Sequence, residues 1–224
     1  MDTLISDCDG VLVNTEAVSE KVLLETLEKL FPGDEVAPIL RPLLGFRIDD
    51  TLTQVSTHFG RPIDQGLAQE LRLDIERRLM EYMPVVEGTG TAMRAVPLVK
   101  KAVVSNSTVE HIRRAVHANG LEDVFGDNLF TANMVGRPKP APDIYLYAAQ
   151  QLGSDPKRCI VVEDSVAGVM ASVAAGMNVI GFVGGEHVMH DQADRLSALG
   201  AARTIDHMDK LVDTVRDMSA AKAG

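Results

Sequence analysis

After residue 88, short apolar runs alternate with segments whose apolar residues recur at helical spacing. Short apolar runs bounded by turn-forming residues are typical of buried strands, whereas apolar positions three and four apart are typical of helices. The predicted strands are residues 3–6, 102–105, 129–132, 159–163, 179–182 and 203–205. The predicted helices of this part are residues 109–119, 144–152, 167–175 and 208–218. This alternation predicts an α/β fold, a Rossmann-like three-layer core whose mainly parallel sheet is covered on both faces.

The segment from residue 15 to residue 83 contains helical patterns only. Its clearest helix, residues 67–83, has an apolar stripe along one face. Gly60 follows another apolar helical pattern and suits the C-terminal end of a helix. The sequence therefore predicts a core made of residues 1–14 and 84–224, interrupted directly after its first strand by an all-helical insert.

Charge and composition narrow the classes of partner. The chain has 224 residues and a formal net charge of −10, so nucleic acid and anionic membrane surfaces are poor partners. A small anionic molecule needs only a local positive site.

We expect no membrane span and no signal peptide, because no long apolar run and no basic segment before an apolar stretch is present. Two cysteines in short apolar runs predict no disulfide and fit a reducing cytoplasm. Without a heptad run or a long apolar edge, a monomer is expected.

Two aspartates follow the first predicted strand. Residues two apart in an extended segment point the same way, so Asp7 and Asp9 are expected to face one site while Cys8 points elsewhere, as a small core residue. Two carboxylates this close repel each other and favour a bound cation or a shared proton. Gly10 lets the backbone turn sharply and approach a ligand closely.

Further polar groups follow the other predicted strands. Ser105 and Asn106 lie between a strand and a helix, where hydroxyl and amide groups form an anion site. Lys139 lies among three prolines, which stiffen the backbone and aim its ammonium group with little loss of entropy. Glu163 and Asp164 end another strand just before a helix. Ligands of such sheets bind at the carboxyl ends of the strands, so all these groups are expected at one edge.

Four segments resemble the four ordered motifs of the haloacid dehalogenase-like hydrolases, in the branch of phosphoglucomutases and phosphatases that carry a helical cap. The segments are DCDGVLVNTE, VVSNS, PKPAPDIY and VVEDSVAGVMASVAAGM. The resemblance covers nearly the whole chain and gives residues 15–83 the role of the cap. It implies a Mg²⁺-dependent phosphatase acting on a small phosphorylated metabolite, such as a sugar, polyol or sugar-acid phosphate.

The resemblance also implies catalytic roles. Asp7 matches the nucleophile that forms an aspartyl-phosphate, and Asp9 matches the residue that acts as general acid and then as general base. Ser105 matches the residue that hydrogen-bonds the transferring phosphoryl group, and Lys139 matches the cation beside the nucleophile and the phosphate. The expected phosphate-binding residues are Gly10, Ser105, Asn106 and Lys139.

A magnesium site follows from the same resemblance. Asp164 matches a metal ligand, together with Asp7 and the main-chain carbonyl of Asp9, while Glu163 matches a position that reaches the metal through water. Oxygen ligands with retained waters are what magnesium prefers. A carboxylate that attacks a phosphate dianion meets anion–anion repulsion, which magnesium and a lysine offset.

Three departures from the family pattern concern loop geometry and substrate preference. Ser6 precedes the nucleophile where Phe is common, and Asn14 stands where Asp is common. Arg137-Pro138 precedes Lys139 where Gly is usual. None of these departures removes a catalytic group.

Other functions remain open. A β-phosphoglucomutase-type transferase would use the same two aspartates, but those mutases carry a histidine early in the cap, where this chain has Val18-Ser19-Glu20. A dehalogenase would need neither Asp9 nor Asp164. A signalling receiver phosphorylated on aspartate would lack the large helical insert.

Some residues have a second, structural interpretation. Among the arginines of the insert, Arg47 is the candidate substrate contact, because it lies in a predicted loop. His187 and His190 are three residues apart, but without a nearby cysteine or further histidine they are interpreted as solvated loop residues. Asp143 is expected to cap the helix that follows it.

Overall fold

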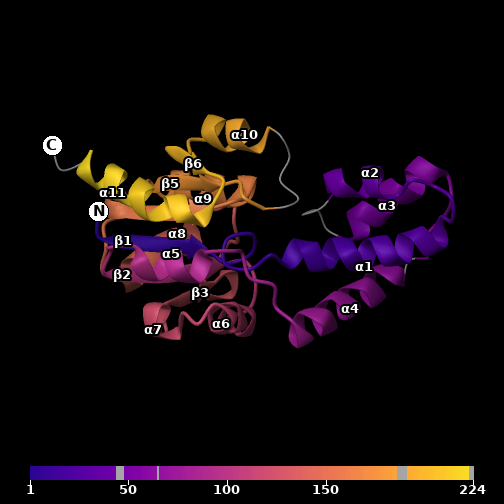
Figure 1. Ribbon diagram of the computed structural model, residues 1–224, viewed down its shortest axis with the longest axis horizontal. Coiled ribbons are helices and arrows are strands. Elements are labelled where there is room, and N and C mark those ends of the chain that lie inside the picture. Colours follow the sequence, from indigo (N-terminus) through magenta and orange to yellow (C-terminus); the bar gives the residue numbers. More distant parts are fainter. Residues whose placement is uncertain (44–47, 65, 186–190, 222–224) are drawn as a thin grey trace. The chain divides into compact units, whose positions relative to one another are not determined.

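The chain forms two compact units in a computed structural model that describes residues 1–43, 48–64, 66–185 and 191–221 (Figure 1). The core unit comprises Met1–Val13 and Val85–Gly224, and the helical unit comprises Asn14–Pro84. Each unit has its own apolar core. The helical unit is therefore an insertion into the core unit, after its first strand.

A six-stranded sheet forms the centre of the core unit, and its strands pair in parallel in the order β3-β2-β1-β4-β5-β6. The strands are β1 (Thr3–Asp7), β2 (Lys100–Ser105), β3 (Leu129–Thr131), β4 (Cys159–Glu163), β5 (Asn178–Phe182) and β6 (Arg203–Ile205). The predicted α/β fold is confirmed, with all six predicted strands present. The strand order reverses between β1 and β4, and ligands of such sheets bind outside the carboxyl ends of the strands at this point.

Seven α-helices accompany this sheet in the described part of the core unit. They are α5 (Thr89–Ala95), α6 (Val109–Ala118), α7 (Glu122–Phe125), α8 (Asp143–Gln151), α9 (Val166–Ala174), α10 (Gln192–Ala198) and α11 (Leu211–Ala220). The sequence pattern predicted α6, α8, α9 and α11. It missed α5, α7 and α10, which are seven residues long or shorter and show too few turns for a helical period to emerge.

Both faces of the sheet are buried. Ile5 and Val161 pack against α8, α9 and α10 in one apolar cluster, while the alternate residues Leu4 and Val162 are also fully buried. A strand buried on both faces has no polar face, which explains the continuous apolar runs of the sequence. α5 and α11 contact each other and lie side by side along the sheet in Figure 1.

The helical unit contains α1 (Thr15–Leu30), α2 (Ala37–Leu40), α3 (Ile48–Phe59) and α4 (Leu67–Glu81) among its described residues. The predicted stripe of α4 is largely buried, at Leu71, Ile75 and Leu79. Gly60 follows α3 with a φ of +63°, in the left-handed region that favours glycine at a helix end. No helix in the described ranges is both long and apolar enough to cross a membrane.

One local prediction was wrong. Asp143 does not cap α8, because Pro142 occupies the N-cap position and Asp143 is the first helical residue, where its carboxylate pairs with Arg137 at 2.9 Å. An acidic residue in the first turn still interacts favourably with the helix dipole. Cys8 is fully buried, as predicted for a small core residue, and lies one residue beyond the end of β1.

Candidate active site

The polar residues predicted at strand ends meet at one edge of the sheet. Asp7 ends β1, and Ser105 and Glu163 end the neighbouring strands β2 and β4. The register places Asp7 opposite Val104 of β2, so these strands end at nearly the same level. Lys139 comes to the same edge from the loop after β3, where its ammonium contacts Asp7. This edge is also where the strand order reverses.

The Lys139 ammonium is the centre of a buried cluster. Its Nζ donates hydrogen bonds to Asp7 Oδ1, to Glu163 Oε1 at 2.7 Å and to the main-chain oxygen of Val104 at 3.3 Å. The side chains of Lys139 and Glu163 are 5% and 0% exposed. Taking such charges out of water costs free energy that their attraction does not reliably recover. A buried charge cluster at a ligand-binding edge is therefore better explained by chemistry than by stability.

Asn106 holds the backbone of this lysine. The Lys139 N–H donates to Asn106 Oδ1 at 3.0 Å, and Asn106 Nδ2 donates to the Lys139 carbonyl at 3.4 Å. The side chain after β2 thus fixes the loop after β3, and so fixes the position of the ammonium group. The contact of Asn106 with a phosphate remains a prediction.

Glu163 is fully buried and fully hydrogen-bonded. Its Oε1 also accepts from the Tyr145 hydroxyl at 2.9 Å, and its Oε2 accepts from the N–H and the Oγ of Ser165, both at 3.0 Å. Burial raises the pKa of the Tyr145 hydroxyl well above its usual value, so the phenol stays a donor. A Cβ at Gly168 would overlap the Glu163 carboxylate, so α9 can pack this closely only with glycine there.

The cluster has more negative than positive charge. Burial raises the pKa of Asp7 to about 8; Lys139 opposes this shift, and the carboxylates of Glu163 and Asp9 add to it. Burial by itself would lower the pKa of Lys139, but the carboxylates of Asp7 and Glu163 hold it well above its usual value. One ammonium group therefore faces several carboxylates, and further positive charge at this position would be strongly stabilised.

Carboxylate oxygens of Asp7, Glu163 and Asp164 lie within 4.8 Å of one another. This donor set fits a hard divalent cation, which takes oxygen ligands. Gly10 leaves room for the set: its φ is +84°, and a Cβ there would overlap the Asp164 carboxylate. The three acidic residues could thus hold a divalent metal ion. The structure gathers Asp7, Glu163 and Asp164 as the sequence predicted, whereas the side chain of Asp9 belongs to a neighbouring group.

Asp9 lies beside this cluster and is more open to solvent. Its Oδ1 is 2.8 Å from His111 Nε2, and its Oδ2 accepts from Ser105 Oγ at 3.3 Å. Its side chain is 36% exposed, which leaves it accessible to a ligand. The prediction that Cys8 points elsewhere was wrong, because its Sγ lies within 4.8 Å of both the Asp9 carboxylate and the His111 ring. Burial and the neighbouring carboxylates raise the pKa of the Cys8 thiol well above its usual value, so it stays a thiol.

Sequence reasoning missed His111 and Tyr145. His111 lies in the first turn of α6, and its N–H donates to the capping hydroxyl of Thr108 at 3.2 Å. The location could have been inferred, because a helix that starts directly after β2 has its first turn at the active edge. Tyr145 gave no such indication, since it lies in the apolar stripe of α8 like an ordinary core residue.

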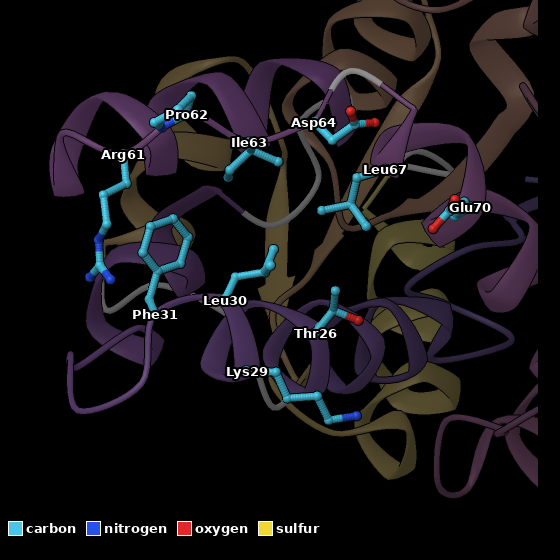
Figure 2. Close-up of a pocket in the computed structure, with 10 residues that line it drawn as sticks. All are labelled: Thr26, Lys29, Leu30, Phe31, Arg61, Pro62, Ile63, Asp64, Leu67 and Glu70. Atoms are coloured by element: carbon cyan, nitrogen blue, oxygen red, sulfur yellow. The ribbon is translucent and has the colours of Figure 1, made fainter.

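Other predicted candidates are not at this edge. Arg47, His187 and His190 lie outside the described residues. The described helical unit contains a cavity of about 680 Å³ (Figure 2), lined by residues of α1 and α4 and of the segment between α3 and α4. In it Arg61 stands over the Phe31 ring, 4.7 Å from the centroid, and is ion-paired with Asp34. Its positive charge is thus compensated.

Comparisons with known proteins agree with this geometry. Residues 1–176 match the model of the haloacid dehalogenase-like hydrolases. The chain is 24% identical to a 6-phosphogluconate phosphatase of Escherichia coli over 84% of this chain and 85% of that protein. It is 31% identical to hexitol phosphatase B of the same species over 79% of this chain and 81% of that protein.

Two solved structures are similar over nearly their whole length. A haloacid dehalogenase-like protein of unknown function from Agrobacterium tumefaciens has a TM-score of 0.88 and 32% identity, covering 98% of this chain and 99% of that chain. A hydrolase from Deinococcus radiodurans, solved with bound phosphate and sodium, has a TM-score of 0.86 and 30% identity, covering 98% and 96% of the two chains. On its sequence, fold and strand-end motifs, this chain belongs to the haloacid dehalogenase-like hydrolase family.

Proposed function

We propose that this protein is a Mg²⁺-dependent phosphatase that hydrolyses a small phosphate monoester through an aspartyl-phosphate on Asp7. The observation that carries the proposal is the contact of Asp7 with Lys139 at the end of β1, beside the carboxylates of Glu163 and Asp164. A nucleophile fixed by an ammonium group, next to a place for a divalent cation, suits attack on an anionic phosphorus centre.

In the first step, a carboxylate oxygen of Asp7 attacks phosphorus and the bond from phosphorus to the ester oxygen breaks. The departing oxygen would be a poor leaving group as an alkoxide, so Asp9 gives it a proton. Lys139 stays protonated and stabilises both the nucleophile and the negative charge of the transferring group. Asp9 is suited to this role because it lies near Asp7 and remains accessible.

In the second step, water attacks the phosphorus of the aspartyl-phosphate. Asp9, now a carboxylate, takes a proton from this water, and the bond from phosphorus to the Asp7 oxygen breaks. Inorganic phosphate leaves and the Asp7 carboxylate is restored. Ser105 Oγ, within 3.3 Å of Asp9, lies where it could hydrogen-bond the phosphoryl group in both steps.

Asp7 and Asp164 would hold the magnesium ion, with the Asp9 carbonyl as a further ligand and Glu163 at the edge of the site. When bound, the ion supplies positive charge that offsets the repulsion between the nucleophile and the phosphate. The excess of carboxylates over ammonium groups supports a requirement for such an ion.

The proposed substrate is a phosphorylated sugar, polyol or sugar acid in the cytoplasm. Support comes from relatives named 6-phosphogluconate phosphatase and hexitol phosphatase, and from the related hydrolase that binds phosphate. The chain leaves the core unit at Val13, shortly after Asp9, and re-enters it at Val85. These two valines pair with each other. We propose that the helical unit acts as the cap that closes over the substrate.

A mutase is not favoured. Both curated relatives described above are named phosphatases, and Val18-Ser19-Glu20 contains no histidine. Two solved structures named as β-phosphoglucomutases share only 21–22% identity with this chain and support the fold alone. Asp9 and Asp164 likewise have no use in a dehalogenase.

The proposal is tested by phosphate release from a panel of small phosphate esters, for wild type and Asp7→Asn, in magnesium and in EDTA. Wild type should release phosphate only with magnesium, and Asp7→Asn should lose at least about 10⁴-fold because it removes the nucleophile. Circular dichroism controls for folding. Equal activity of the two proteins would refute the role of Asp7, and full activity in EDTA would refute the metal requirement.

A further inference from the structure

We propose that His111 is a positioning residue for Asp9 and determines which oxygen of that carboxyl group transfers the proton; the inference rests on the proposed function. His111 Nε2 lies 2.8 Å from Asp9 Oδ1. The imidazole is 16% exposed and the Asp9 side chain 36%. The histidine is therefore the more buried partner, and it can orient the more accessible carboxyl group.

The two oxygens of Asp9 are held differently. Oδ1 has the short contact with His111, whereas Oδ2 accepts a longer bond of 3.3 Å from Ser105 Oγ. Ser105 is the predicted partner of the phosphoryl group, so its bond to Asp9 can be exchanged when a substrate binds. The bond at Oδ1 faces α6 instead. Holding Oδ1 therefore directs Oδ2 toward the reacting groups.

His111 is itself well fixed. Its backbone N–H donates to Thr108 Oγ1 at 3.2 Å in the first turn of α6. The next residue, Ile112, is fully buried, so this turn is anchored in the core of the unit. A group fixed by the fold lowers the entropy that must be lost when Asp9 reaches its reactive orientation.

The proposed role leaves the proton balance of the reaction unchanged. In the first step the proton on Oδ2 moves to the leaving oxygen as the bond from phosphorus to that oxygen breaks. In the second step Oδ2 takes a proton from the attacking water. The proposed role uses the tautomer with hydrogen on Nε2, which donates to Oδ1 in both steps. His111 thus acts through Asp9 and does not touch the substrate.

A different use of the same group is less well supported. Cys8, Asp9 and His111 could together hold a soft metal ion, since their ligand atoms lie within 4.8 Å. A metal-binding cysteine must lose its proton. Burial raises the pKa of the Cys8 thiol well above its usual value, so a metal ion would have to displace its proton. The contact of 2.8 Å between His111 Nε2 and Asp9 Oδ1 is that of a direct hydrogen bond, and it needs no metal ion.

The test compares His111→Ala and His111→Gln across phosphate monoesters with different leaving groups. General acid catalysis matters most for alkyl phosphates and least for 4-nitrophenyl phosphate, whose leaving group needs no proton. His111→Ala should lower kcat/KM about 10- to 100-fold for alkyl phosphates but no more than about 3-fold for 4-nitrophenyl phosphate. His111→Gln retains an N–H near Oδ1 and should recover most of the loss.

His117→Ala is the matched control. His117 lies on the same helix and its Nδ1 contacts Glu122 Oε1 at 2.6 Å, but its side chain is 82% exposed. It should leave kcat/KM unchanged for every ester. Thermal unfolding of all three variants separates folding defects from catalytic ones.

The outcomes are distinct. A loss that grows with the basicity of the leaving group and is recovered in His111→Gln supports the inference. Equal losses for all esters, or no loss, would overturn it while leaving the phosphatase intact. Absence of turnover by the wild type on every ester would refute the proposed function, and the inference with it.

Discussion

One cluster of ion pairs in the core unit and one ion pair in the helical unit lie in opposite environments. In the core unit, Lys139 pairs with Asp7 and Glu163, and all three side chains are 10% exposed or less. In the helical unit, Arg72 pairs with Asp49 between α4 and α3, and these side chains are 45% and 47% exposed. The Lys139–Glu163 pair, at 2.7 Å, and the Arg72–Asp49 pair, at 2.8 Å, have similar contact distances, but only the first has been removed from water.

We infer from this difference that burial of a whole charge cluster, more than contact distance, distinguishes the charges proposed to act in catalysis. Exposed pairs are screened by solvent and contribute little to stability, so a helical surface can carry many of them without a specific role. Buried pairs oppose folding unless their partners are well placed. Most charged side chains of the chain remain in contact with water. The charges of Asp7, Lys139 and Glu163 are instead buried, at the place where a negatively charged ligand is expected to bind.

The largest effect is expected for Lys139→Met. It removes the cation between two buried carboxylates, so the free energy of unfolding should fall by about 3–5 kcal/mol. Phosphate release should fall at least about 10³-fold, because the charge that stabilises the phosphoryl group is lost. Urea unfolding and phosphate release measure the two effects.

Lys101→Met is the matched control for that variant. Lys101 is another buried lysine of the core unit, but its Nζ donates to the main-chain oxygen of Met93 at 2.7 Å. Its replacement should lower stability and leave kcat within about 3-fold of wild type, since no reacting group is involved. A similar loss of activity in Lys139→Met and Lys101→Met would mean that removal of any buried lysine lowers activity. Lys139 would then have no specific role in phosphate release.

Phe31→Ala should have the largest effect on the helical unit. Phe31 is 2% exposed, contacts the Phe59 ring at a centroid distance of 4.8 Å and lies under Arg61. Its truncation should cost about 3–5 kcal/mol. Hydrogen exchange should locate the loss in Asn14–Pro84. Equal loss of protection throughout the sheet would instead mean that the two units unfold together.

An intermediate effect is expected on the Tm when EDTA removes divalent metal ions and the pH is raised. The pKa of Asp7 rises from 3.8 to about 8 on folding without metal, so the folded state binds more protons than the unfolded state across this range. The stability from this group is complete below about pH 4 and is lost as the pH rises toward 8. In EDTA the Tm should therefore fall by roughly 5 °C between about pH 5 and pH 8.

Magnesium should flatten this dependence, because the ion stabilises the ionised carboxylate. Asp7→Asn should flatten it as well, because the titrating group is gone. A dependence that persists unchanged in Asp7→Asn would assign it to another group.

The smallest effect is expected for Arg72→Ala. The pair with Asp49 is half exposed, so its loss should lower the Tm by less than about 2 °C and leave activity unchanged. A shift as large as that of Lys139→Met would show that exposure does not distinguish the two kinds of pair.

Much of the architecture could be predicted from the sequence. Strands buried on both faces produce apolar runs, and polar residues end those runs where ligands bind, so β1 and β4 with Asp7 and Glu163 could be placed directly. Lys139 could be assigned to the site only through its motif, because the loop after β3 has no periodicity that would locate it in space.

The other features of the site depend on tertiary contacts, which the pattern of apolar and polar residues does not indicate. His111 approaches Asp9 across 102 residues of sequence. Tyr145 looks like a core residue because most of it is one, and only its hydroxyl reaches Glu163. The grouping of Cys8 with Asp9 arises because β1 ends at Asp7, so alternation along a strand no longer applies there.

The two chain segments that connect the core unit to the helical unit are paired with each other, and this pairing affects which insertions the core can accept. Val13 and Val85 pair directly, and Val86 N–H donates to the Leu12 carbonyl at 3.1 Å, so the chain is fastened where it leaves and re-enters the sheet unit. The entry and exit points of the inserted segment are therefore neighbours, the arrangement in which foreign domains are best tolerated. Helical units of other lengths could therefore replace this one at the junction without altering the register of the sheet.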